Sequence, residues 1–102
     1  MIVIEKNPGE KIPYEVHGTK VTFDDELTLN LAKLERDWPI HREVYYDADG
    51  ELITGIQAAT ALVAEIDIPE AQYETTGSDG EEERVKKPID MDAVTLTLWA
   101  ID

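Results

Sequence analysis

The chain alternates apolar and polar residues with a period of two, in short runs that turn residues separate. In one run, Val94, Leu96 and Leu98 alternate with Thr95 and Thr97. Successive side chains of a strand point to opposite faces of the sheet, so this period is typical of half-buried β-strands. About eight such runs predict a mainly β chain. We expect residues 1–102 to form one small single-domain antiparallel β-sandwich or barrel, with at most one short helix.

The last of these runs carries apolar side chains on both faces. One face is expected to hold Val94, Leu96, Leu98 and Ala100, and the other Thr97, Trp99 and Ile101. One of the two faces should fill the core. We regard the second face as the candidate interaction surface, because exposed apolar patches mark sites where partners bind.

Residues 27–38 fit two patterns, because their leucines alternate as in a strand and also recur at helical spacing. Thr28 and Asn30 are poor helix formers. We therefore favour a strand up to Leu31, followed by a helical turn over residues 33–37. The alternative is one helix that Pro39 ends.

The pair Asp49-Gly50 lies between two β-prone runs. Glycine takes a positive φ without steric cost, so this pair predicts a hairpin with arms over Ile40–Tyr46 and Glu51–Ile56. A connector is expected at 57–59.

A further alternating run, which Pro69 ends, predicts a half-buried strand. In this run Leu62, Ala64, Ile66 and Ile68 alternate with Val63, Glu65 and Asp67.

Residues 75–87 predict one long surface loop, because nothing in them can pack into a core. The charge of this stretch changes sign, from Glu81, Glu82 and Glu83 to Arg84, Lys86 and Lys87. We favour a solvated tip whose charges oppose aggregation. The alternative is a docking handle that pairs with a complementary patch, with the three glutamates as candidate interaction residues.

Acidic residues outnumber basic ones by 23 to 9, which gives a formal net charge of −14. This balance excludes the usual electrostatic footprint of a nucleic-acid binder and argues against attraction to an anionic membrane. The chain has no cysteine, which excludes disulfides and a thiol nucleophile. Its one serine, Ser78, lies in a polar stretch that offers no triad. We expect no enzyme activity, no cofactor and no small-molecule substrate.

Two histidines repeat one local arrangement, in Glu15-Val16-His17 and His41-Arg42-Glu43. On a strand, the histidine and glutamate of each pair share a face. Four such side chains could surround a metal if the two strands were neighbours. We favour surface cross-strand pairs instead, and predict no metal site.

The order of three segments resembles a family of small, acidic, uncharacterised proteins encoded in prophages of Firmicutes. The segments are Leu27-Thr28-Leu29-Asn30-Leu31-Ala32-Lys33 with Glu35-Arg36-Asp37, then Val63-Ala64-Glu65-Ile66-Asp67-Ile68-Pro69, and Asp90-Met91-Asp92-Ala93-Val94-Thr95-Leu96-Thr97-Leu98-Trp99. None is a catalytic signature. The resemblance implies a structural or assembly protein encoded among virion and tail genes, and it carries over no functional residues.

On this reading, we expect the chain to be a non-enzymatic phage structural or assembly protein associated with the tail, whose partners are other phage structural proteins or further copies of itself. The alternative is an acidic inhibitor that mimics nucleic acid and occupies the basic groove of a host or competitor protein. No basic leader precedes an apolar run, and no run approaches the roughly 20 apolar residues of a spanning helix. We expect synthesis in the cytoplasm, with incorporation into a phage particle as a later step.

Overall fold

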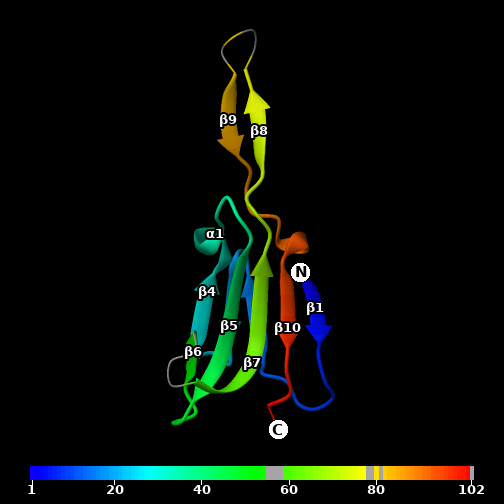
Figure 1. Ribbon diagram of the computed structural model, residues 1–102, viewed down its shortest axis with the longest axis vertical. Coiled ribbons are helices and arrows are strands. Elements are labelled where there is room, and N and C mark those ends of the chain that lie inside the picture. Colours follow the sequence, from blue (N-terminus) through cyan, green and yellow to red (C-terminus); the bar gives the residue numbers. More distant parts are fainter. Residues whose placement is uncertain (55–58, 78–79, 81, 102) are drawn as a thin grey trace.

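A computed structural model describes residues 1–54, 59–77, 80 and 82–101, and it consists mainly of strands (Figure 1). The elements are, in chain order, β1 (Ile2–Glu5), β2 (Tyr14–His17), β3 (Lys20–Phe23), β4 (Leu27–Asn30), α1 (Leu31–Leu34), β5 (Ile40–Asp47), β6 (Leu52–Thr54), β7 (Ala59–Ile68), β8 (Tyr73–Thr76), β9 (Glu83–Lys86), a 3₁₀ turn (Met91–Ala93) and β10 (Thr95–Leu98).

The strands form three sheets. A five-stranded sheet has the order β1-β10-β7-β5-β6, a three-stranded sheet the order β2-β3-β4, and β8 and β9 form a two-stranded sheet. The mainly β prediction is confirmed, and the sheets of the described residues do not close into a barrel. All pairs are antiparallel except β1 with β10, which run parallel with Ile2 opposite Thr95.

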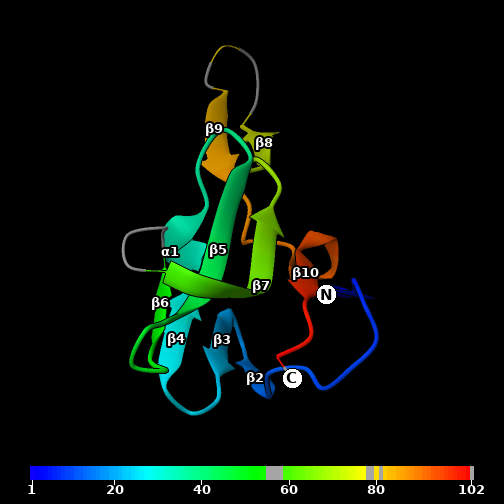
Figure 2. The ribbon, with the colours of Figure 1, turned by 60° about the horizontal axis from the view of Figure 1, so that its bottom comes forward.

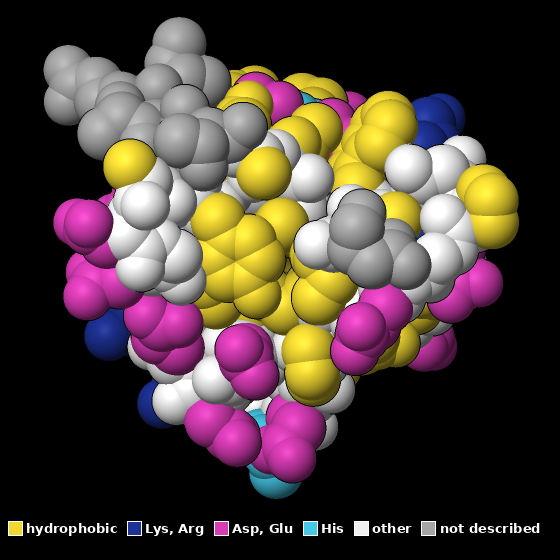
Figure 3. Space-filling view, turned by 90° about the horizontal axis from the view of Figure 1, so that it is seen from below, with side chains coloured by type: hydrophobic (Ala, Val, Ile, Leu, Met, Phe, Trp, Pro, Cys, Tyr) yellow, Lys and Arg dark blue, Asp and Glu magenta, His cyan; other side chains and the backbone are white. Residues whose placement is uncertain are grey.

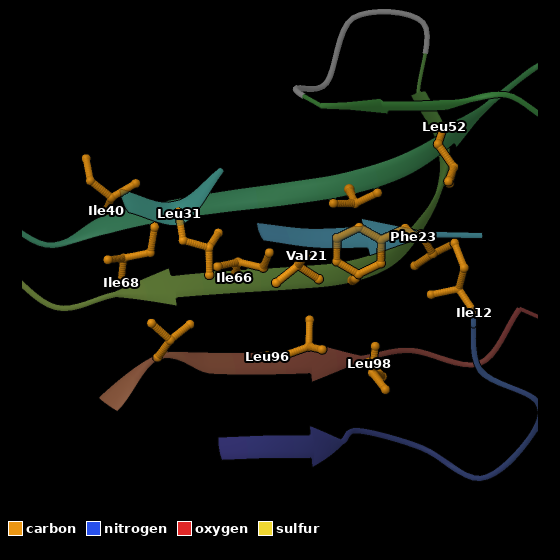
Figure 4. Packing of buried hydrophobic residues seen from close by; sticks show 14 residues of the cluster. Ile12, Val21, Phe23, Leu31, Ile40, Leu52, Ile66, Ile68, Leu96 and Leu98 are labelled. Carbon is orange, nitrogen blue, oxygen red and sulfur yellow. The ribbon is translucent and has the colours of Figure 1, made fainter. Parts of the chain in front are cut away.

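The core lies between the five-stranded and three-stranded sheets (Figures 2 and 4). Val21 and Phe23 of β3 are fully buried and lie near Ile66 of β7 and Leu96 and Leu98 of β10. Burying a large apolar side chain contributes about 1.5–3 kcal/mol, so this layer is the main source of stability. The period-two pattern of the sequence therefore gives each of these two sheets one apolar inner face.

The segment 27–38 begins as a strand and continues as a short helix, as predicted. β4 ends at Asn30, and α1 then turns Leu31 into the core, where it is fully buried. The helix starts two residues before the predicted turn at 33. Arg36 and Trp38 follow it in exposed positions.

The hairpin of β5 and β6 is also as predicted. Gly50 takes a φ of +78°, and the Oδ1 of Asp47 accepts hydrogen bonds from the backbone N–H groups of Asp49 and Glu51, both at 2.9 Å. The predicted end of the second arm at Ile56, and the connector residues 57 and 58, lie outside the described residues.

The pairing of β5 with β7 contains a β-bulge that the sequence pattern did not indicate. Val44 pairs with Ala64, whereas Tyr45 pairs with Leu62, so Val63 has no residue directly opposite. Val63 and Ala64 are both buried as a result, and strict alternation along β7 is broken.

The prediction of one long loop over 75–87 is wrong. β8 and β9 pair from Tyr73 opposite Lys86 to Thr76 opposite Glu83, so the stretch includes the end of one strand and the whole of the other. The guanidinium of Arg84 stacks over the ring of Tyr73, 4.1 Å from its centre. The hairpin is held by cross-strand side-chain contacts and backbone pairing, because it has no core to pack against.

This hairpin makes the molecule long. It projects from one end of the two larger sheets (Figure 1), and the overall dimensions are 59 × 26 × 20 Å. The radius of gyration is 16.5 Å, compared with about 13 Å for a compact chain of this length.

Candidate functional site

Four polar side chains gather on the outer face of the five-stranded sheet. His41 and Glu43 lie on β5, opposite Asp67 and Glu65 of β7. Their neighbours along the strands, such as Ile66, point into the core, so the alternation that builds the core also places these four together outside. We call them the polar cluster.

His41 contacts a carboxylate with each ring nitrogen. Its Nδ1 lies 2.6 Å from Oδ1 of Asp67, and its Nε2 lies 3.5 Å from Oε1 of Glu65. The hydrogen bond with Asp67 raises the pKa of His41 above its usual value, burial opposes this rise, and the charges of Asp67, Glu65 and Glu43 reinforce it. The imidazole is therefore fixed between two acids.

Two aromatic side chains orient the glutamates of the cluster. The hydroxyl of Tyr45 donates to Oε2 of Glu43 at 3.0 Å, and Nε1–H of Trp99 donates to Oε2 of Glu65 at 2.8 Å. Burial and the bond to Glu43 raise the pKa of Tyr45. The other oxygen of Glu65, Oε1, is the one that contacts His41.

A shallow hollow of about 230 Å³ borders this cluster. His41 and Asp67 form part of its wall, together with Pro39, Pro69 and Thr95. Solvent therefore reaches the imidazole, which is 46% exposed, whereas the side chain of Glu65 is only 21% exposed.

The predicted interaction face of the last strand is only partly formed. Thr97 is buried at 8% exposure, and Trp99 is half-buried with its indole N–H bound to Glu65. β10 ends at Leu98, so the alternation does not continue, and Ile101 packs against the core. The prediction that Ile101 shares a face with Thr97 and Trp99 is therefore wrong.

The acidic run lies at the hairpin. Glu82 and Glu83 are exposed, and Glu83 is the first residue of β9. Glu81 lies outside the described residues.

The base of the hairpin is attached to the segment after α1. Nζ of Lys86 lies 2.9 Å from Oε1 of Glu35, a side chain only 6% exposed, although this oxygen accepts no well-directed hydrogen bond. The hydroxyl of Tyr73 donates to Asp37, and the N–H of Ala71 donates to the carbonyl of Arg36 at 2.8 Å. These contacts fix the direction in which the hairpin projects. They join Tyr73 of β8, Lys86 of β9 and Ala71, which precedes β8, to residues 35–37 after α1.

The two His–Glu pairs do not meet in one site. Nε2 of His17 lies 3.2 Å from Oε2 of Glu15 on β2, which belongs to the three-stranded sheet, whereas His41 lies in the five-stranded sheet. His41 and Glu43 find their further partners on β7. The sequence pattern identified His41 and Glu43 of the polar cluster. It missed Glu65 and Asp67, because local spacing does not show which strands are neighbours in the sheet.

The remaining exposed apolar surface includes the edge strand β1. Ile2, Val3 and Ile4 are 51%, 43% and 42% exposed. One edge of β1 pairs with β10, and no strand of the described residues pairs with the other. Backbone groups along such an edge are available to a further strand.

Charge is distributed around the end of the molecule remote from the hairpin. Seen from that end, acidic side chains surround a hydrophobic centre (Figure 3). Asp24 and Asp25 lie in the turn between β3 and β4, with positive φ values of 50° and 52°. These two acids therefore lie in a turn and not in an ordered row along a strand.

Comparisons with family models, with curated proteins and with solved structures found no match to this chain. Within the part of the chain that the structure describes, no helix is both long and apolar enough to cross a membrane.

Proposed function

We propose that this protein is a non-enzymatic structural or assembly component of a phage particle, associated with the tail, that acts through protein–protein contacts. The resemblance of the sequence to prophage-encoded proteins supports the phage assignment. The projecting hairpin of β8 and β9 is the observation that supports action through protein–protein contacts.

The hairpin suits a docking role because it is exposed and attached in a fixed direction. Every residue of β9 is exposed, including Val85 at 40%, yet Lys86 reaches a buried carboxylate at the base. A projection held in one direction loses less conformational entropy on binding than a free loop does. The neighbouring charges of Glu83 and Arg84 can set the register of a partner.

The open edge of β1 supports the same mode of action. An extended segment of another protein can add to a free edge by backbone hydrogen bonds, while exposed side chains provide apolar contact. Among the described residues, no strand pairs with the outer edge of β1, which also carries the exposed Ile2, Val3 and Ile4, so a second contact can be made on the five-stranded sheet.

The test is retention of an identified virion protein on the immobilised chain. We expect Val85→Glu to abolish retention, because it places a charge in the apolar contact of the hairpin. Val16→Glu is the matched control, because Val16 is 42% exposed on a strand of the three-stranded sheet and should leave retention unchanged.

Retention should persist at about 1 M salt, where the Debye length is only about 3 Å, because burial of apolar area does not depend on the ion atmosphere. Loss of the partner at that salt, together with displacement by DNA, would contradict the proposal and favour the nucleic-acid mimic.

A further inference from the structure

We propose that His41, Glu43 and Glu65 form a binding site for one Zn²⁺ ion on the outer face of the five-stranded sheet. Each residue offers one ligand atom, and the three atoms lie within 4.8 Å of one another. One imidazole and two carboxylates form a mixed nitrogen and oxygen set of the kind that zinc takes. The site is independent of the proposed assembly function.

The spacing of the ligand atoms fits a small tetrahedral ion. Nε2 of His41 and Oε1 of Glu65 are 3.5 Å apart. Zinc bonds of about 2.0–2.1 Å in tetrahedral geometry separate two ligand atoms by about 3.4 Å. These two atoms are therefore already at the distance at which one ion binds both.

The pairing of the strands places two like charges opposite each other. Glu43 and Glu65 are direct cross-strand partners, an arrangement that destabilises a sheet unless a positive charge lies between them. Protonated His41 supplies part of that charge. A divalent ion would supply all of it, and would bind both carboxylates at once.

Side chains outside the ligand set hold each ligand in the orientation that binding needs. Asp67 holds Nδ1 of His41 at 2.6 Å, which leaves Nε2 directed toward Glu65. Trp99 occupies Oε2 of Glu65, and Tyr45 occupies Oε2 of Glu43. Metal-binding histidines commonly give their second nitrogen to a carboxylate, and ligating carboxylates are themselves hydrogen-bonded. The cluster has both features, because Asp67 contacts His41, Trp99 donates to Glu65 and Tyr45 donates to Glu43.

Three protein ligands leave a fourth position for water. The side chain of His41 is 46% exposed, so solvent reaches the cluster and an ion can enter without movement of the sheet. The half-buried position of Glu65 lowers competition by water for its carboxylate.

The chain contains its own control in Glu15 and His17. This pair has the same spacing along a strand and a contact of 3.2 Å, but its side chains are 64% and 74% exposed. Among the described residues, no third ligand joins it. General attraction of zinc to an acidic chain would involve both histidines, whereas a built site involves His41 alone.

The experiment is calorimetric titration of the untagged full chain with ZnCl₂, after removal of metals with EDTA and with Mg²⁺ in excess to occupy weak acidic sites. We expect one Zn²⁺ per chain for the wild type and for His17→Ala. His41→Ala and the isosteric Glu65→Gln should abolish saturable binding.

Trp99→Phe keeps an aromatic side chain and removes the N–H that orients Glu65, so affinity should fall about 10–100-fold. Circular dichroism of each variant confirms that the fold persists. In ¹⁵N spectra of the imidazoles, Zn²⁺ should shift Nε2 of His41 and leave His17 unchanged. Equal losses in the two histidine variants, equal shifts of the two rings, or no saturable binding by the wild type would each overturn the proposal.

Discussion

At the scale of single residues, burial separates aromatic side chains that look alike in the sequence. Phe23 is fully buried between the two larger sheets, whereas Trp38 is 60% exposed beside the hairpin base. The less favoured alternative for residues 27–38 was one helix up to Pro39, but α1 ends at Leu34, so no helix carries Trp38 inward.

We expect Phe23→Ala to lower the free energy of unfolding by about 3–5 kcal/mol, because it removes buried contacts and leaves a cavity. Trp38→Ala should change it by no more than about 0.5 kcal/mol, as is usual for surface substitutions. Urea denaturation followed by circular dichroism measures both. A similar loss for the two variants would contradict the position of Trp38.

The pKa of Tyr73 gives a test that depends on pH. The hydrogen bond to Asp37 raises this pKa above 10, its ordinary value, with burial and the charge of Asp37 adding to the rise and Arg84 and Lys86 opposing it. A raised pKa in the folded state means that this contribution to stability is complete below about pH 10 and is lost as pH rises through the folded value.

Tyr73→Phe should therefore remove part of the decline in melting temperature that the wild type shows above pH 10. Tyr14→Phe is the control for loss of a phenol elsewhere. Absorbance near 295 nm follows the ionisation directly, and a transition of Tyr73 at or below pH 10 would disprove the shift.

At the scale of elements, the sequence predicted the turn between β5 and β6 but not which further strands pair with each other. Asp49-Gly50 predicted the hairpin of β5 and β6 because glycine takes the positive φ that this turn requires. The sequence did not predict the hairpin of β8 and β9, because its strands lack apolar alternation. The contact of Arg84 with Tyr73 joins the two strands instead. The same limit applies to the polar cluster, since Glu65 reaches His41 only through the order and register of β5 and β7.

The attachment of the hairpin depends on Glu35. We expect Glu35→Gln to weaken the contact with Lys86 and to lower amide-exchange protection in Glu83–Lys86, while protection in β7 and β10 stays unchanged. Glu74→Gln is a control on the same hairpin, because Glu74 is exposed. Unchanged protection in Glu83–Lys86 would show that backbone pairing alone fixes the hairpin.

At the scale of the whole molecule, the projection accounts for the elongated shape and the two larger sheets account for the core. Replacing residues 73–86 by a short Gly–Ser linker should therefore bring the radius of gyration from 16.5 Å toward about 13 Å, as X-ray scattering in solution can measure. Unfolding should stay cooperative, because Val21, Phe23 and their neighbours are untouched. Loss of cooperative melting would show that the hairpin supports the core.

The parallel pair of β1 and β10 joins distant parts of the chain, and the N–H of Ala100 donates to Oδ1 of Asn7, 93 positions earlier. During translation, β1 leaves the ribosome long before the strand that receives it has been made. The backbone groups of β1 that pair with β10 stay without that partner over this interval, and the closure of so long a loop is entropically costly. The nascent five-stranded sheet is thus completed at this edge only after β10 has been made, so the first strand of the chain is among the last to be paired.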